Sequence, residues 1–222
     1  MQPYITVLPW DSGFFGVRIG QSDIQTQAML EDILSEASSK KLDLVYLFSD
    51  IKLDGVSFPA EIRAYYEAPV LDLPKPKPPN DIWYRYRRLR YSDVPALYGI
   101  SAGFITFSRF RSFSQDKLIQ FYRLCVDRDI DRGRIYVIEY HGLVAGFVSL
   151  REGRISLIGV HDSLQGQGIG KHLLDIAMHD ANVNSIETLK VNTNKDNLPA
   201  RNLYEKCGFK MVKQEYIYHV WI

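Results

Sequence analysis

The chain has 222 residues, enough for one large domain or about one and a half. Its 46% hydrophobic, 13% aromatic and 24% charged residues are typical of a globular protein with a sizeable core, which excludes global disorder. The 27 Lys and Arg against 26 Asp and Glu leave a formal charge of +1, so no overall field attracts nucleic acid or an anionic membrane.

Cysteine usage and the first residues indicate the compartment. Cys125 and Cys207 lie far apart and outside any CxxC pattern, which argues against a disulfide scaffold or a zinc site and fits a reducing cytoplasm. We therefore expect a cytoplasmic protein with no metal. Residues 1–20 contain Asp11 and Arg18 and lack the basic start and apolar run of a signal peptide. No run of about 18 apolar residues occurs, which predicts no membrane span and no membrane partner.

Four prolines, at positions 74, 76, 78 and 79, divide the chain, because proline is excluded from helix interiors and central strands. We predict a small α/β N-terminal domain over 1–73, an extended linker over 74–80 and the main domain over 81–222. The apolar patterns before the linker predict strands over 4–8 and 44–48 and a helix over 28–39.

Strands and helices alternate regularly after the linker. Strands are expected over 83–90, 134–140, 143–150, 155–160 and 188–193, with one or two more over 209–221. Helices are expected over 92–102, 114–126, 169–181 and from Asn197 to before Gly208. His141-Gly142 is expected to form a two-residue hairpin turn, because glycine adopts the positive φ that this turn requires.

A glycine-rich segment, Gln165-Gly166-Gln167-Gly168-Ile169-Gly170, lies between a buried strand and a long amphipathic helix. Backbone N–H groups and a helix N-terminus converge there, which is typical of phosphate sites. A nucleoside-triphosphate loop does not fit, because Gln165 stands where its first glycine belongs and His172 where its hydroxyl belongs. A dinucleotide loop does not fit either, since Lys171 replaces its third glycine.

A third pattern does match: Gln/Arg-x-x-Gly-x-Gly/Ala between a strand and a helix, followed by Asn197 and by Leu203-Tyr204-Glu205-Lys206-Cys207-Gly208-Phe209. Over 82–222 the chain thereby resembles the GNAT N-acetyltransferases. The resemblance implies an α/β fold with a mixed, splayed central sheet, and acetyl-coenzyme A bound with its pyrophosphate in the loop. Asp162 stands where many members have proline, a change that leaves the loop backbone intact.

The resemblance also implies where the chemistry takes place. Ile158, Gly159 and Val160 would line the slot for the pantetheine arm and offer N–H groups to the thioester carbonyl. The pyrophosphate would be bound by Gln165, Gly166, Gln167, Gly168, Ile169 and Gly170, and the pantetheine by Asn197, which also caps a helix. Tyr204 would protonate the departing thiolate, as suits a phenol with a pKa of about 10, or would only pack in the core.

The general base is left open. Glu152 follows a central strand and His161 borders the loop, so either could take the amine proton directly or through water. A 4-amino sugar can also do without a dedicated base, since its amine is partly neutral near pH 7.

Shorter motifs bear on the acceptor. Residues 11–17, 108–111 and 148–152 are similar to the GNAT enzymes that acetylate dTDP-4-amino-4,6-dideoxygalactose for surface polysaccharide, which also carry a small N-terminal domain. This implies a nucleotide-activated amino sugar, with Arg109 and Arg111 at its diphosphate and Phe15 against the sugar or base. Two alternatives stay open: a protein or small-molecule amine as acceptor, and a non-catalytic acyl-coenzyme A-binding regulator. The sequence leaves the question of a homodimer open.

Overall fold

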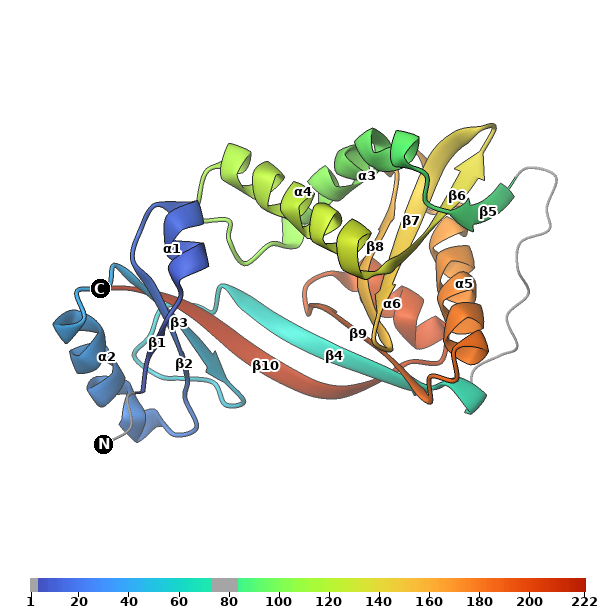
Figure 1. Ribbon diagram of the computed structural model, residues 1–222. Helices are drawn as coiled ribbons and strands as arrows, with labels where there is room; N and C mark the ends of the chain where they lie inside the picture. The colour runs from blue at the N-terminus through green and yellow to red at the C-terminus, as the bar shows by residue number, and fades with distance from the viewer. Residues whose placement is uncertain (1–3, 73–83) are drawn as a thin grey trace.

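One twisted sheet runs through the part of the chain that this computed structural model describes, residues 4–72 and 84–222 (Figure 1). Its strand order is β1-β2-β3-β10-β4-β9-β8-β7-β6-β5. The strands are β1 (Thr6–Val7), β2 (Ile19–Asp23), β3 (Leu44–Ser49), β4 (Glu61–Pro69), β5 (Tyr84–Arg88), β6 (Arg134–Tyr140), β7 (Leu143–Arg151), β8 (Arg154–Val160), β9 (Thr188–Asn194) and β10 (Lys210–Trp221).

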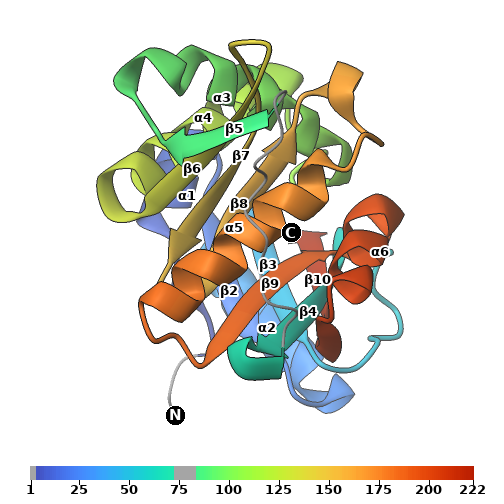
Figure 2. The same cartoon turned by 90° about the vertical axis from the view of Figure 1, so that its right-hand side faces the viewer.

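Helices cover both faces of this sheet. The α-helices are α1 (Pro9–Phe15), α2 (Leu30–Ser39), α3 (Val94–Ser101), α4 (Gln115–Arg132), α5 (Ile169–Val183) and α6 (Leu198–Lys206). Short 3-10 helices are η1 (Gln27–Met29), η2 (Val70–Asp72), η3 (Tyr91–Asp93), η4 (Ala102–Phe107) and η5 (Asp162–Leu164). Figure 2 shows α5 and α6 on one face, with α3 and α4 behind the sheet. The mixed sheet and its helices confirm the expected GNAT-type α/β fold.

The sheet does not separate the two predicted domains. β3 pairs with β10, the last strand of the chain, from Leu44 to Ser49. β4 lies between β10 and β9 and pairs with both. Segments before the prolines therefore complete the same sheet as those after them, and the division into domains at 74–80 stays a prediction. The linker 74–80 lies within 73–83, outside the described residues.

Most helices and strands expected in the main domain are confirmed, with two changes in detail. The helix after Ser114 extends to Arg132, and the Ser114 hydroxyl caps it by accepting the Lys117 N–H at 3.4 Å. Ser92 does not cap α3. Asp93 organises that start instead, because its carboxylate accepts the Arg90 N–H at 2.7 Å and a double hydrogen bond from Arg87.

Two hydrophobic clusters position the candidate site. The first lies beneath α5, whose buried stripe is the expected one: Ile169, Leu173, Leu174, Ala177 and Met178. The second is aromatic and joins α1 and the start of α4 to β3, through Phe15, Phe110, Phe121 and Tyr46. Burial of this second cluster fixes the N-terminal segments against the segment that follows η4.

Candidate functional site

β8 and β9 are parallel neighbours that separate along their length. A single register pair, Arg154 with Lys190, joins them at the start of both strands. β8 nevertheless stays paired with β7 as far as Val160, and β9 with β4 as far as Asn194. The sheet therefore opens between β8 and β9 toward Val160, as the resemblance implied.

The open edge of β8 presents backbone groups at alternate residues. The His161 N–H donates to the Ala145 carbonyl at 2.8 Å, so Val160 and Gly146 form a non-hydrogen-bonded pair. By the alternation of an antiparallel ladder, the N–H and C=O groups of Val160 and Ile158 point away from β7, into the opening. Gly159 points its N–H toward β7. Of the three residues expected to offer donors, Ile158 and Val160 are the ones whose N–H groups face the opening.

Gly159 has a packing role that the sequence did not reveal. A Cβ at this position would lie 2.7 Å from Ile100 Cγ2 and 2.9 Å from Phe104 Cζ. Glycine therefore lets α3 and η4 pack directly on β8. Side chains of the protein core, Ile100 and Phe104, are therefore the groups that come close to Gly159.

We expect Gly159→Ala to lower the free energy of unfolding by about 1–3 kcal/mol, because the added methyl group overpacks this contact. Urea unfolding of the variant beside the wild type measures the change. A variant as stable as the wild type would show that α3 and η4 move aside freely.

The glycine loop is built as the sequence predicted. It runs from η5 into α5, with Gly166 at φ +79° and Gly168, the N-cap of α5, at φ +83°. A Cβ at either position would meet no atom within 4 Å. Among the described residues no acceptor receives the N–H groups of Gly166, Gln167 and Gly168. The loop thus keeps both space and free donors in front of a helix N-terminus, which fits a pyrophosphate.

The remaining loop residues support this shape. The Gln165 amide donates to the Val160 carbonyl at 3.3 Å and to Asp162 Oδ1 at 3.0 Å, which ties the loop to the end of β8. Gly170 allows α6 to approach, since a Cβ there would lie 3.0 Å from Leu203 Cδ2. Ile169, the first residue of α5, is buried against the sheet.

Asn197 and Tyr204 lie on α6, which packs beside α5. The side-chain oxygen Oδ1 of Asn197 accepts the Ala200 N–H at 3.3 Å, so its capping role is confirmed. The Tyr204 ring is buried, with 3% exposed, between Tyr66 and Phe209. Burial raises the Tyr204 pKa further above its usual value, and the neighbouring Tyr66 adds to the effect. Its hydroxyl therefore stays protonated at neutral pH, and it has no hydrogen-bond partner among the described residues.

A polar network on β4 and β10 was missed by the sequence analysis. Glu61 binds Arg63 through both carboxylate oxygens at 3.1 and 2.9 Å, and Glu215 accepts the Tyr65 hydroxyl at 2.7 Å. Arg63 pairs with Asn194 in the sheet, and the Asn194 amide donates to the Phe107 carbonyl of η4. The network therefore faces η4, on the opposite side of the sheet from α5 and α6.

The acceptor residues predicted from the sequence are not brought together as a pair. The guanidinium of Arg109 lies among the rings of Tyr46, Phe48 and Phe110. Arg111 is exposed, and its nearest hydrogen bond is to the Thr106 carbonyl at 3.5 Å.

Phe15 lies inside the aromatic cluster. It is 7% exposed and stacks on Phe113 at 4.2 Å. Its contact with an acceptor stays a prediction.

Neither residue considered as the base faces the open end of the gap with a free side chain. Glu152 lies in the β7–β8 turn at φ +50°, about 20 Å along the strand from Val160. His161 follows β8 directly, but its ring Nδ1 is 2.9 Å from the Ser163 hydroxyl and the residue is exposed.

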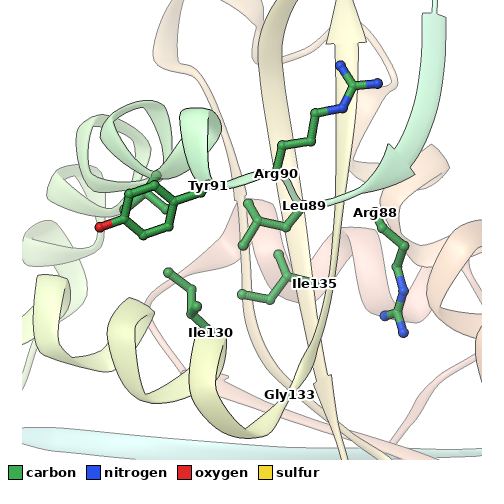
Figure 3. A pocket seen from close by; sticks show the side chains of 8 residues that line it. Arg88, Leu89, Arg90, Tyr91, Ile130, Gly133 and Ile135 are labelled. Carbon is green, nitrogen blue, oxygen red and sulfur yellow. The ribbon is translucent and has the colours of Figure 1, made fainter.

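A separate hollow lies beside β5, η3 and the end of α4 (Figure 3). Arg88, Leu89, Arg90, Tyr91, Val94, Ile130, Gly133 and Ile135 line it. None of the expected site residues is among them. Within the described ranges, no three His, Cys, Asp or Glu side chains are grouped as a metal site. No helix in these ranges is long and apolar enough to span a membrane.

Comparison with known proteins shows what the chain is similar to. Residues 102–209 match the model of the acetyltransferase (GNAT) family. The chain is 32% identical over 91 residues to the uncharacterized N-acetyltransferase YvbK of Bacillus subtilis, covering 39% of this chain and 59% of YvbK. It is 33% identical over 85 residues to the 5-NmdU N-acetyltransferase of Pseudomonas phage PaMx11, covering 36% and 59%. The chain thus spans about three fifths of the length of these two relatives.

Solved structures extend the likeness to the whole fold. A functionally unknown protein from Staphylococcus epidermidis superposes with a TM-score of 0.70 at 13% identity, covering 99% of this chain and 91% of the other. A GCN5-related N-acetyltransferase from Sphaerobacter thermophilus gives 0.60 at 14% identity, covering 98% and 76%. The chain has the GNAT fold. Its sequence similarity to the GNAT acetyltransferase family lies in residues 102–209.

Proposed function

We propose that the protein is an N-acetyltransferase that moves the acetyl group of acetyl-coenzyme A directly to an amine of an acceptor bound beside it. The observation that carries the proposal is the coincidence of two features at one end of β8. The β8–β9 gap opens there, and the glycine loop with its free N–H groups starts there. One feature fits a pantetheine arm and the other a pyrophosphate.

The chain's own residues would then divide the work. Residues 165–170 hold the pyrophosphate, and Ile158 and Val160 offer backbone N–H donors to a carbonyl oxygen in the gap. Such a preorganised donor is worth about 3 kcal/mol to a developing oxyanion. Tyr204, whose burial raises its pKa and keeps the hydroxyl protonated, would give its proton to the departing thiolate, and the proton that the attacking amine loses would restore the hydroxyl. Acetyl-coenzyme A itself supplies the activated acetyl group.

We propose a nucleotide-linked amino sugar of the dTDP-4-amino-4,6-dideoxyhexose type as the acceptor. The support is the short motifs noted above and the cationic side chains of Arg109 and Arg111 after η4, which suit a phosphate-bearing molecule. The acceptor would approach from the η4 side of the sheet, opposite the glycine loop.

A small cationic amine is the second candidate. The observation in its favour is the pair of carboxylates Glu61 and Glu215, whose side chains are 10% and 13% exposed on this same side. Arg63 neutralises part of their charge. Lys213 also lies 3.6 Å from Glu215, so two cations share the two carboxylates, whose oxygens can still accept hydrogen bonds from an ammonium group.

Mass spectrometry after incubation with acetyl-coenzyme A decides between them. The panel contains a dTDP-4-amino-4,6-dideoxyhexose, a polyamine and a lysine peptide. We expect a 42 Da gain on the nucleotide sugar. A gain confined to the polyamine would select the second candidate, and no acetylation of any amine would count against an enzyme for these acceptors.

A further inference from the structure

Three neighbouring side chains on β3, on β10 and after η4 have buried polar atoms with no hydrogen-bond partner in the described part of the chain. They are the hydroxyl of Tyr46 on β3, Nη1 of Arg109, and both ring nitrogens of His219 on β10. Tyr46 is fully buried and His219 is 8% exposed. A buried polar group without a hydrogen bond is destabilising, so native structures contain few of them. A cluster of three such side chains therefore requires a physical explanation.

Aromatic rings hold the guanidinium of Arg109 by its faces. Its central carbon lies 4.7 Å from the Tyr46 ring centre and 4.5 Å from that of Phe110. The Tyr46 ring in turn stacks on His219 at 4.5 Å. Stacking stabilises a cation but uses none of the N–H donors, which lie in the guanidinium plane. The arginine is thus held in place with its hydrogen-bonding fork unused.

No carboxylate among the described residues lies within ion-pair distance of Arg109. Asp11 and Glu61 are near enough to favour its charge, while burial and Arg63 lower its pKa. Arg63 itself is paired with Glu61. Burial and the charge of Arg109 lower the pKa of His219 to about 3, so this imidazole is neutral and has one N–H donor. The cluster therefore presents one cation and neutral donors to whatever lies beside it.

We propose that Arg109, the Tyr46 hydroxyl and the His219 imidazole bind one oxyanion group of the acceptor, a carboxylate or a phosphate. A planar guanidinium fork matches either group with two parallel hydrogen bonds. This inference rests on the proposed function, since it concerns that enzyme's acceptor. The proposal gives β3 and β10 a role in binding the acceptor. This role is separate from those proposed for the glycine loop and the β8–β9 gap.

The position of the cluster supports this role. Arg109 lies two residues after η4, whose last residue, Phe107, accepts the hydrogen bond from Asn194 at the end of β9. Figure 1 shows the segment between η4 and α4 running from the β8–β9 region toward α1, above β3 and β10. The Glu61–Arg63 pair is near enough to act on the charge of Arg109, and Arg63 pairs in the sheet with Asn194, the last residue of β9.

Isothermal titration of the full chain with two inert probes tests the inference. dTDP offers phosphate and N-acetylglycine offers carboxylate, and neither has an amine to acetylate. We expect one probe to bind, and Arg109→Gln to raise its Kd about tenfold or more, the loss of a hydrogen bond to a charged group. Tyr46→Phe keeps the ring stacking and deletes the hydroxyl, so it should raise the Kd about two- to tenfold without lowering the melting temperature.

Arg123→Gln is the matched control, because Arg123 also lies over a tyrosine ring, that of Tyr98, but on the exposed side of α4. It should leave the Kd unchanged. The probe that binds identifies the group as phosphate or carboxylate. Binding of neither probe, or equal Kd values for wild type, Arg109→Gln and Tyr46→Phe, would overturn the inference.

The two proposals fail separately. If amines are acetylated and their KM does not change in Arg109→Gln and Tyr46→Phe, the proposed acetyltransferase activity stands and the anion site is rejected. If a probe binds through Arg109 but the protein acetylates no amine, the anion site stands and the proposed acetyltransferase activity is rejected.

Discussion

Gly168→Val is expected to weaken acetyl-coenzyme A binding by about 100-fold or more while the protein stays folded. The space in front of Gly168 is open in the protein alone, so the added side chain meets the cofactor rather than the fold. It would push the pyrophosphate from N–H groups whose hydrogen bonds to a charged group are worth about 1.5–3 kcal/mol each. Titration calorimetry with acetyl-coenzyme A measures the change.

The control must reproduce the backbone strain of valine at a positive φ. Gly55 provides it, since its φ is +71° and a Cβ there also meets no atom within 4 Å. It lies in the loop before β4, beside Gln27 and away from the β8–β9 gap. Gly55→Val should cost similar stability and leave the affinity unchanged. Equal acetyl-coenzyme A affinity in both variants would place the cofactor elsewhere.

Tyr204→Phe is expected to lower kcat by about 10²-fold with little change in the KM for acetyl-coenzyme A. The ring contacts with Tyr66 and Phe209 remain, and only the proton for the leaving thiolate is lost. Because burial raises the pKa of Tyr204, its ionisation should reduce kcat of the wild type only above pH about 10.

Tyr66→Phe separates chemistry from packing. Tyr66 lies 5.7 Å from Tyr204, and its hydroxyl donates to Glu205 and accepts from Arg201. Its loss should reduce stability and leave kcat near the wild-type value. A Tyr204→Phe enzyme with normal kcat would make Tyr204 a packing residue and require another acid.

Local sequence signals were sufficient to predict the glycine loop, the packing of α5 and the cap of α6. Gly166 and Gly168 adopt the positive φ that explains why glycine stands there, and the apolar stripe of α5 packs as its spacing indicated. Asn197 caps α6 by the interaction its side chain favours. Each of these features depends on residues a few positions apart, which is why the sequence alone predicts them.

β4 was missed although it alternates. Ala64, Tyr66 and Ala68 are buried, while Arg63 and Tyr65 point to the polar network. The small alanines and the charged residues between them hide the strand, because its apolar face is completed by neighbours distant in sequence. Without β4, the sequence analysis did not reveal that the N-terminal segments pair with β10 and β9 in one sheet.

The surroundings of Phe15 and Arg109 could not be derived from short motifs. Phe15 stacks on Phe113, nearly a hundred residues later, and Arg109 meets Tyr46 on a strand of the N-terminal segment. These contacts depend on how distant segments pack, which no local spacing encodes. The motif at 108–111 did contain Arg109, whereas the environment that makes it unusual is a property of the fold.

Amide hydrogen exchange with and without acetyl-coenzyme A tests the central claim that the cofactor binds between β8 and β9. The account predicts slower exchange on binding at residues 166–170 and at the amides of Ile158 and Val160, which face the opening. Gly159, paired with Phe147 on β7, should change less. Unchanged exchange over 158–170, or protection confined to the hollow lined by Arg90, Tyr91 and Ile130, would contradict it.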